Sequence, residues 1–320
     1  MKVVVLDGHT LNPGDNPWSP VSDAVGPGSE FIVYPRTAPE DVIARSQGAE
    51  ILLTNKTELT KAHLEALPDA KLICVLATGV NAVDLEASKA LGICVCNVPE
   101  YGTLSVAQFV FAQILHLSHQ VAHHDQRIRD GKWQECGEFS FWDTPQIELA
   151  GRTLGIIGFG RIGQAVANLG KAFGMKVIAY SPRMTESNAL AECVSLNALL
   201  ERSDIVSLHC PLTNDNAHLI RQETLDRMRK GALLINTARG GLICEADLRE
   251  ALVSRRLGGA ALDVSEKEPM PLDSPLLDAP NVLLTPHMAW GSVQARRRLM
   301  ETTGENISAW LEGKPKSRVA

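Results

Sequence analysis

Three polar residues of types that can bind and protonate a small anion each follow an apolar run of the sequence: Arg239, Glu268 and His287. A guanidinium stays charged and can bind a carboxylate through two parallel hydrogen bonds. A histidine can give a proton to a forming alkoxide near neutral pH, and a carboxylate beside it would favour the imidazolium and fix its orientation. Taken singly, each residue is equally compatible with a solvated loop position. Taken together, they predict a site that orients a 2-oxo acid and protonates its oxygen.

A glycine-rich turn lies upstream of these residues, in the run TLGIIGFGRIG at 153–163. The run begins as a buried strand, turns on glycines and continues as a helical pattern. Gly158 permits the tight turn, Gly160 lets backbone approach a pyrophosphate, and Gly163 lets the helix pack closely on the strand. The phosphates would lie at the helix N-terminus. The run therefore predicts a dinucleotide site, with a glycine-rich turn of some other α/β protein as the alternative. The expected cofactor contacts in this turn are Gly158, Gly160, Arg161, Ile162 and Gly163.

The elements that must position these residues alternate between short apolar strands and helical patterns. In the first hundred residues the expected strands are 3–6, 51–54, 72–76 and 93–97. A second series starts at 154 and continues with 177–180, 205–208, 233–236, 259–264 and 282–285. Such alternation predicts parallel sheets covered by helices. Because the carboxyl ends of parallel strands share one edge of a sheet, Arg239, Glu268 and His287 are expected to converge on a bound nicotinamide.

The glycine turn lies in the middle of the chain, so a whole α/β unit precedes the cofactor domain. We expect an α/β fold of two doubly wound domains, in which a Rossmann-type cofactor domain is inserted into a flavodoxin-like substrate domain. The cofactor domain would span 101–290, and the substrate domain would combine 1–100 with a terminal helix in 291–320. A cleft between two domains is the default place for ligands.

Composition excludes several classes of partner. The chain has 320 residues, 45% hydrophobic content and a net charge of -6, with acids and bases mixed along it. Neither a nucleic acid nor a membrane surface is an expected partner, because there is no basic stripe. The uncharged run 101–124 is interrupted by glutamines and histidines, which favours a buried or interface helix over a membrane span. Seven scattered cysteines and no signal peptide favour reduced thiols and a cytoplasmic location.

Three histidines, His116, His119 and His123, fall on one face of a predicted helix. Such spacing can hold a metal ion. No cysteine or acidic ligand accompanies them in the pattern, and a metal site needs converging ligands with a supporting shell. A polar helix face at a domain or subunit boundary is therefore the preferred interpretation, and no metal is expected.

Five ordered segments resemble the signatures of the D-isomer-specific 2-hydroxyacid dehydrogenases, and they span almost the whole chain. They are ATGVNAVD at 77–84, HCPLT at 209–213, NTARGG at 236–241, ALDV at 261–264 followed by Glu268-Pro269, and TPHMAW at 285–290. The resemblance implies that Arg239 binds and polarises the substrate, that His287 is the acid or base, and that Glu268 tunes the histidine. Glu266 is a competing acid two positions earlier, but only Glu268 directly precedes the proline.

The resemblance also implies the remaining binding residues. The backbone amides of Gly79 and Val80 would bind the substrate carboxylate, and Asp263 would contact the nicotinamide carboxamide. Further cofactor contacts are expected from Cys210, Pro211, Thr237 and Ala238. The segment 104–146 resembles a dimer arm, so a homodimer is expected.

Two further segments, LDGHTLNPG at 6–14 and FWDTP at 141–145, are similar to those of glycerate dehydrogenases, also called hydroxypyruvate reductases. This narrower resemblance implies reduction of hydroxypyruvate or glyoxylate to D-glycerate or glycolate. Two alternatives stay open. One is a related dehydrogenase acting on another small anion, such as phosphoglycerate or phosphite. The other is a dinucleotide-sensing binding protein of the same fold.

One departure from the usual pattern leaves the choice between NAD and NADP open. Enzymes that use NAD typically carry an acid at the end of the second cofactor-domain strand, where it binds the ribose hydroxyls. Here that position is Ser181, followed by Pro182 and Arg183. Ser181 and Arg183 could instead contact a 2′-phosphate. The sequence therefore predicts NAD or NADP without deciding between them.

Overall fold

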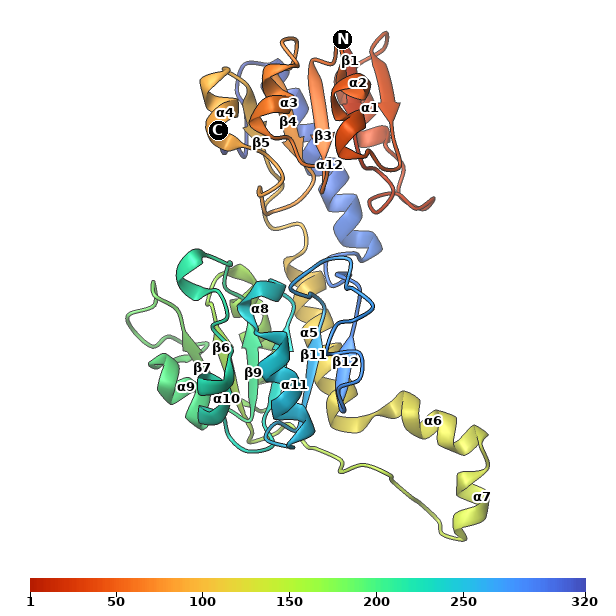
Figure 1. Cartoon of the computed structure of the whole chain (residues 1–320), viewed down its shortest axis with the longest axis vertical. Coiled ribbons are helices and arrows are strands. Elements are labelled where there is room, and N and C mark those ends of the chain that lie inside the picture. Colours follow the sequence, from red (N-terminus) through yellow and green to blue (C-terminus); the bar gives the residue numbers. More distant parts are fainter. The chain divides into compact units, whose positions relative to one another are not determined.

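All strands of the chain pair in parallel, and they form one sheet of five strands and one of seven. The computed structural model describes residues 1–320. Two compact units divide the chain, one made of 1–102 with 291–320 and the other of 103–290 (Figure 1). Each unit contains one of the two sheets, so the predicted fold class of two parallel α/β domains is confirmed.

The sheet of the first unit has the strand order β2-β1-β3-β4-β5, which is the flavodoxin-like order. Its strands are β1 (Lys2–Val5), β2 (Glu30–Val33), β3 (Ile51–Thr54), β4 (Leu72–Val75) and β5 (Cys94–Cys96). The helices of this unit are α1 (Ser19–Val25), α2 (Val42–Ser46), α3 (Lys61–Glu65), α4 (Leu85–Ala90) and α12 (Val293–Leu311), with a short 3-10 helix at Pro39–Asp41. β1, β3 and β4 are buried over almost their whole length, which is typical of a parallel sheet covered on both faces.

The terminal helix α12 belongs to the first unit and is tied to its N-terminal segment. Arg296, whose side chain is only 7% exposed, binds the carboxylate of Asp15 through two hydrogen bonds of 2.6 and 2.7 Å. The Arg296 guanidinium holds the pKa of the Asp15 carboxyl below its usual value. A Cβ atom at Gly304 would lie 2.1 Å from the carbonyl oxygen of Pro20, so α1 and α12 touch only because this position has no side chain.

The sheet of the second unit has the order β12-β11-β10-β9-β6-β7-β8, in which the chain winds outward in both directions from β6. Its strands are β6 (Thr153–Ile157), β7 (Lys176–Tyr180), β8 (Glu192–Cys193), β9 (Ile205–Leu208), β10 (Leu233–Asn236), β11 (Gly259–Leu262) and β12 (Val282–Leu284). Its helices are α5 (Thr103–His119), α6 (Val121–Arg129), α7 (Lys132–Cys136), α8 (Arg161–Ala172), α9 (Leu196–Arg202), α10 (Gln222–Arg227) and α11 (Glu245–Val253), with short 3-10 helices at Asn214–Asn216 and Gly240–Leu242. This is the doubly wound arrangement of dinucleotide-binding domains.

Helices cover both faces of this second sheet. Alternate strand residues such as Leu233 and Ile235 pack with α5 and α8 on one face, and Leu234 packs with α9, α10 and α11 on the other. Two strands of this sheet end earlier than the sequence predicts. β11 ends at Leu262 and β12 ends at Leu284. The next residues, Asp263 and Thr285, leave the strands to form the hydrogen bonds described below.

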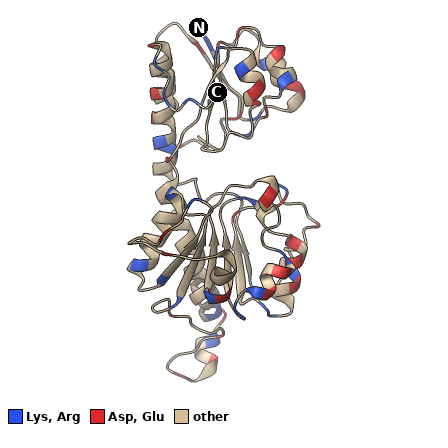
Figure 2. Ribbon diagram, turned by 90° about the vertical axis from the view of Figure 1, so that its left-hand side faces the viewer, with Lys and Arg blue, Asp and Glu red and all other residues tan.

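Helix α5, which contains most of the uncharged run of the sequence, is partly buried. Helix α5 buries seven of its side chains, among them Val110, Phe111 and Gln113. No helix of the chain combines the length and apolar character that a membrane span requires. Figure 2 shows blue and red residues interspersed on the helices of both units.

We call residues 121–146 the arm. It contains α6 and α7, neither of which buries a side chain, and in Figure 1 it extends away from the sheet of the second unit. Several of its apolar side chains are exposed, including Val121 at 70%, Phe139 at 91% and Trp142 at 65%. A helix that packs none of its side chains against the rest of its own chain gains little stability from that chain.

Candidate active site

The turn that carries Arg239 is held by the last residue of β10. The side chain of Asn236 is fully buried; its Nδ2 donates to the carbonyl oxygen of Arg239 at 2.9 Å, and its Oδ1 accepts from the Ala238 N–H at 2.9 Å. The Arg239 guanidinium donates to the Ala238 carbonyl at 2.6 Å and has no carboxylate partner. It is exposed, so its remaining N–H donors are available to an anionic ligand.

Gly240 brings the Arg239 turn against the loop that carries Glu268. A Cβ atom at Gly240 would lie 1.9 Å from the carbonyl carbon of Ser265, so only glycine allows this approach. Ser265 in turn donates its N–H to Glu268 Oε1 at 3.3 Å and its hydroxyl to the Lys267 carbonyl at 2.7 Å. The residues that follow β10 and β11 are therefore packed into one surface.

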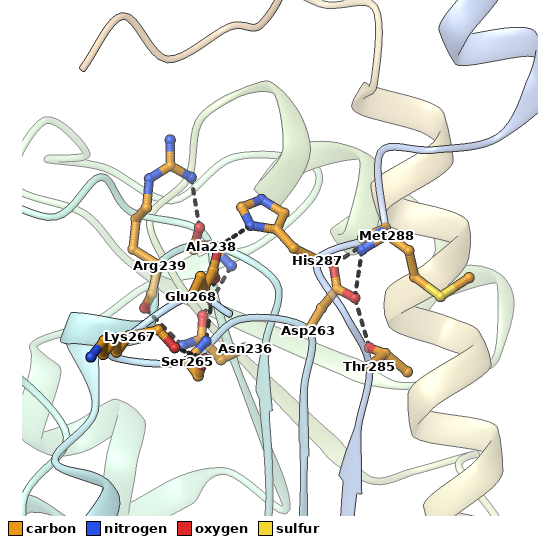
Figure 3. Close-up of polar contacts among 11 residues, drawn as sticks. Asn236, Ala238, Arg239, Asp263, Ser265, Lys267, Glu268, Thr285, His287 and Met288 are labelled. Atoms are coloured by element: carbon orange, nitrogen blue, oxygen red, sulfur yellow. Dashed lines mark hydrogen bonds and ion pairs between the residues drawn. The ribbon is translucent and has the colours of Figure 1, made fainter. Parts of the chain in front are cut away.

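His287 and Glu268 form a close pair, with 2.6 Å between Nδ1 of the histidine and Oε2 of the carboxylate (Figure 3). The side chains are 26% and 37% exposed. Because an ionised carboxylate only accepts hydrogen bonds, Nδ1 carries the proton and Nε2 faces away from the pair. This arrangement leaves Nε2 as the atom that can exchange a proton with a substrate.

The competing acid Glu266 is engaged elsewhere. Its Oε1 accepts the Glu245 N–H at 3.0 Å, and its own N–H donates to Glu245 Oε1 at 2.8 Å. It also lies 3.4 Å from Nε2 of His218, an exposed histidine. Of the two acids in this loop, the structure therefore brings Glu268 and not Glu266 to His287.

The side chain of Asp263 anchors the loop that carries His287. Its carboxylate is 1% exposed and accepts three hydrogen bonds from that loop: the Thr285 hydroxyl at 2.7 Å, the Met288 N–H at 2.9 Å and the Ala289 N–H at 2.8 Å. Its backbone carbonyl accepts the His287 N–H at 2.8 Å. Burial raises the pKa of the Asp263 carboxyl, against the effect of these hydrogen bonds. A contact of Asp263 with a nicotinamide carboxamide stays a prediction.

These bonds fix a strained backbone. His287 has a φ of 51°, in the left-handed region that residues with a Cβ atom adopt at a cost. Figure 3 shows Asp263, Thr285 and Met288 joined around this turn, with the His287 ring directed toward Glu268. The geometry of the histidine is thus imposed by its surroundings.

The glycine turn fits a dinucleotide. Gly158 has a φ of 95°, and a Cβ atom there would lie 2.5 Å from the Cys210 nitrogen. A Cβ atom at Gly163 would lie 2.3 Å from the Gly158 carbonyl oxygen, whereas one at Gly160 would meet nothing within 4 Å. The backbone at Gly160 is therefore approachable. The first N–H groups of α8, which begins at Arg161, have no partner within the helix and suit a pyrophosphate.

Other predicted cofactor residues lie on the loops that follow β9 and β10. Thr237 has a buried hydroxyl with no hydrogen-bond partner, which fits a donor or acceptor supplied by a ligand. Cys210 and Pro211 belong to a loop closed by Asn216, whose side chain donates to the Pro211 carbonyl at 2.8 Å and accepts from the Thr213 N–H at 2.7 Å. Ile162 packs its side chain against the core, so only its backbone is available to a cofactor.

His209 anchors the start of the loop after β9 and is a residue whose role the sequence did not indicate. Its Nε2 lies 2.8 Å from the hydroxyl of the fully buried Ser207, and its N–H donates to the Ile157 carbonyl at 2.7 Å. Burial lowers the pKa of the His209 imidazole to about 3. The sequence shows a polar residue, His209, directly after a buried strand. That position alone does not tell whether the residue holds the loop in place or takes part in catalysis.

Gly79 and Val80 lie in the first unit, in the loop after β4. The Thr78 side chain donates to the Val98 carbonyl at 3.0 Å, and the Asn97 side chain donates to the Thr78 carbonyl at 2.7 Å, so this loop is anchored. The N–H groups of Gly79 and Val80 have no acceptor within the chain. Their predicted role in binding a carboxylate is compatible with this geometry and stays a prediction.

The three histidines do not share one helix face as the spacing predicted, because His116 and His119 belong to α5, which ends at His119, whereas His123 belongs to α6. His119 Nδ1 lies 3.2 Å from Gln146 Oε1, and His123 Nε2 lies 3.3 Å from the carboxylate of Asp143, which also binds Arg127 at 2.8 Å. No group of three or more histidine, cysteine or acidic side chains is arranged to hold a metal ion.

Comparisons with known proteins agree with this geometry. Residues 111–289 match the family described as D-isomer specific 2-hydroxyacid dehydrogenase, NAD binding domain. The chain is similar to a hydroxypyruvate reductase of Blautia hydrogenotrophica, with 43% identity over 320 residues covering 98% of each chain. It is 40% identical over 294 residues to a glycerate dehydrogenase of Methylorubrum extorquens, covering 91% of this chain and 92% of that one. The structure is similar to an acyclic imino acid reductase in complex with NADPH and D-Arg, with a TM-score of 0.87, 31% identity and 100% of each chain covered.

The first prediction concerns the support of the His287 loop. In Asp263→Asn, one carboxylate oxygen becomes an NH2 group, so at least one buried donor of the loop loses its acceptor. We expect the free energy of unfolding of the second unit to fall by about 1–3 kcal/mol, measured by denaturant titration. Asp247→Asn is the matched control, because its carboxylate accepts only the Gln222 N–H and the amide retains one oxygen for it. Equal losses in the two variants would contradict the assigned support role.

The second prediction concerns pH. The pKa of His209 is about 3 in the folded chain and about 6.5 when unfolded, so the unfolded state binds more protons between these values. The stability that neutral His209 provides is complete above pH 6.5 and falls as the pH falls toward 3. Lowering the pH from 7.5 to 5 should therefore cost about 2 kcal/mol through this residue. His209→Gln should show a pH dependence smaller by that amount in denaturant titrations at both pH values, and an unchanged pH dependence would contradict the role given to His209.

Proposed function

The chain belongs to the D-isomer specific 2-hydroxyacid dehydrogenase family and is an oxidoreductase acting on the CH–OH group of its donor; from this premise we propose that it reduces hydroxypyruvate or glyoxylate to D-glycerate or glycolate with NAD(P)H. The relatives named hydroxypyruvate reductase and glycerate dehydrogenase support this choice of substrate.

One observation carries the proposal: an arginine with no counter-ion lies on the same surface as a histidine whose Nδ1 is held by a carboxylate at 2.6 Å. The Arg239 guanidinium would bind the carboxylate of a 2-oxo acid and polarise its carbonyl. His287 Nε2–H would point at the carbonyl oxygen. Anion binding and proton donation are the two functions that reduction of a 2-oxo acid requires from the protein.

The cofactor would be held by the glycine turn, the N-terminus of α8 and the residues after β9 and β10. Its nicotinamide supplies a hydride to the carbonyl carbon when bound. His287 gives its Nε2 proton to the carbonyl oxygen, so the C=O bond becomes CH–OH and the imidazolium becomes neutral imidazole. Glu268 accepts the Nδ1–H throughout and stabilises the charged form of the ring before transfer. Water then restores the proton.

The substrate carboxylate would also bind the N–H groups of Gly79 and Val80, which have no acceptor within the chain. Backbone donors of this kind suit a carboxylate because they are fixed by the loop and carry no counter-charge to displace. All seven cysteines are free, and we propose a cytoplasmic location on that basis.

The third prediction tests the reaction. With hydroxypyruvate, glyoxylate, pyruvate and phenylpyruvate as substrates, the first two should give the highest kcat/KM. His287→Gln should lower kcat by about 10²- to 10⁴-fold, because it removes the proton donor. Arg239→Gln should lower kcat and raise KM together, because the guanidinium acts in binding and in polarisation.

His218→Gln is the control for the histidine, since His218 also lies beside a glutamate, Glu266, but on the exposed side of the loop. Arg249→Gln is the control for the arginine, since Arg249 is paired with Glu250 on α11. Both controls should stay within about threefold of the unchanged protein. Near-normal turnover in His287→Gln would exclude the histidine as proton donor, and no turnover with any 2-oxo acid would favour a dinucleotide-sensing protein.

We further propose that the chain forms a homodimer through the arm. The arm buries none of the side chains of α6 and α7 on its own chain, and it presents Trp133, Phe139 and Trp142 to solvent. Exposed aromatic side chains concentrated on one segment mark a protein interface.

The fourth prediction tests this dimer. Light scattering at micromolar concentration should give twice the mass of one chain. Phe139→Asp combined with Trp142→Asp should shift the mass toward that of one chain, because two charges would be buried without partners. Leu272→Asp is the control, as Leu272 is 98% exposed and lies outside the arm. A single-chain mass for the unchanged protein would exclude the proposed dimer.

A further inference from the structure

The loop after β4 is clamped between the loops that follow its two neighbouring strands. β4 lies between β3 and β5 in the sheet of the first unit, so the residues that follow these three parallel strands meet at one edge. Three successive carbonyl groups of the β4 loop each accept a hydrogen bond from a neighbouring loop. The donors are Asn55 Nδ2 for Leu76 at 2.6 Å, the Val98 N–H for Ala77 at 3.1 Å and Asn97 Nδ2 for Thr78 at 2.7 Å.

The next two N–H groups of this loop, those of Gly79 and Val80, have no acceptor within the chain. A peptide group is planar, with its C=O and the following N–H on opposite sides. The Asn97 side chain holds the Thr78 carbonyl, and it therefore also sets the direction of the Gly79 N–H. Beyond the pair, the Val80 carbonyl accepts the Val83 N–H at 3.1 Å. The two N–H groups are thus held from both sides and remain available to a ligand.

The two asparagine side chains act here as donors. A carbonyl oxygen only accepts hydrogen bonds, so the amide nitrogen of each side chain, and not its oxygen, faces the β4 loop. Asn55 is buried, with 6% of its surface exposed, and water cannot readily replace its bond to the Leu76 carbonyl. Removing either donor would leave a carbonyl of the loop unpaired and free to turn.

Both asparagines are themselves fixed by other residues of the first unit. The carboxylate of Asp7, in the segment LDGHTLNPG at 6–14, accepts the Asn55 N–H at 2.8 Å and the next two N–H groups at 2.5 and 2.8 Å. On the other side of the loop, the Asn97 carbonyl accepts Nδ2 of Asn306 on α12 at 2.9 Å, and the Asn97 N–H donates to the Ser317 carbonyl at 3.1 Å. The clamp therefore has a rigid base on each side.

We propose that Asn55 and Asn97 are positioning residues for the substrate carboxylate. They hold the β4 loop so that the Gly79 and Val80 N–H groups stay directed at that carboxylate, and they act through the peptide groups without touching the substrate. The carboxylate keeps its charge while the carbonyl is reduced, so these N–H groups bind the ground state and the transition state alike. Weakening such uniform binding raises KM and leaves kcat nearly unchanged. This proposal rests on the proposed function, in which these N–H groups bind the substrate.

The fifth prediction separates this positioning role from general support of the fold. Asn55→Ala and Asn97→Ala should each raise KM for glyoxylate by about 10- to 100-fold, because a misdirected donor loses much of its bond to a charged group. kcat and the KM of the dinucleotide should stay within about threefold, since the dinucleotide is proposed to bind the second unit. Oxalate, which carries the carboxylate but is not reduced, should lose inhibition of the reaction by the same factor. Asn97→Asp should act like Asn97→Ala, because it places an acceptor against the Thr78 carbonyl.

Asn16→Ala is the matched control. Asn16 is also buried in the first unit, at 2% exposure, and its Nδ2 also donates to a leucine carbonyl, that of Leu11, at 3.0 Å. In denaturant titrations it should lose stability as Asn55→Ala does, but its KM for glyoxylate should stay within about threefold of the unchanged protein.

The outcomes separate the positioning role from the proposed function. An unchanged KM in both asparagine variants, a loss confined to kcat, or an equal rise of KM in Asn16→Ala overturns the positioning role and leaves the proposed function standing. If Asn55→Ala does not fold, Asn97→Ala decides alone, because the Asn97 side chain is only half-buried. No turnover of glyoxylate by the unchanged chain contradicts the proposed function, and the positioning role with it.

Discussion

The buried carboxylate of Asp263 is the interaction on which the catalytic geometry depends. Its two oxygens accept three donors from the Thr285–Ala289 loop, and its carbonyl accepts a fourth from His287. Burying a carboxylate costs free energy unless hydrogen-bond donors satisfy its lone pairs. The buried Asp263 side chain therefore needs the donors of this loop, and the loop needs the carboxylate as its acceptor. They keep His287 in a left-handed conformation that an unsupported loop would leave. The proposed proton donor, His287, is thus positioned by a residue that need not touch the substrate.

Glycines impose the second constraint. At two positions the backbone of one loop lies directly against the backbone of another, and a side chain there would collide with it. Gly158 touches the backbone of His209 and Cys210, and Gly240 touches that of Ser265. These contacts are between residues that follow adjacent or nearby strands of a parallel sheet. They convert the shared sheet edge into one continuous surface, on which the dinucleotide turn and the proposed catalytic residues have fixed relative positions.

Most of the parallel strands follow from features that the sequence displays directly, whereas β2 and β8 were not among the predicted strands. Runs such as 205–208 and 233–236 are apolar on both faces and bounded by helical patterns, so their type and limits could be predicted. The loops could not be predicted in this way. β11 and β12 end before their apolar runs do, because Asp263 and Thr285 satisfy each other across strands that lie far apart in sequence. The choice between Glu266 and Glu268 likewise depends on Glu245, which binds one acid and leaves the other to His287.

Arginines of the second unit differ in whether a carboxylate compensates their charge. Arg127, Arg202 and Arg249 each bind a carboxylate of the same unit, so their charge is already compensated. Arg239 and Arg183 follow β10 and β7 at the carboxyl edge of the sheet and have no such partner. A cation kept without a counter-ion gains little for folding but retains its full attraction for an anion. An uncompensated cation at this edge of the sheet is therefore suited to an anionic ligand, which is the role proposed for Arg239 with the carboxylate of a substrate.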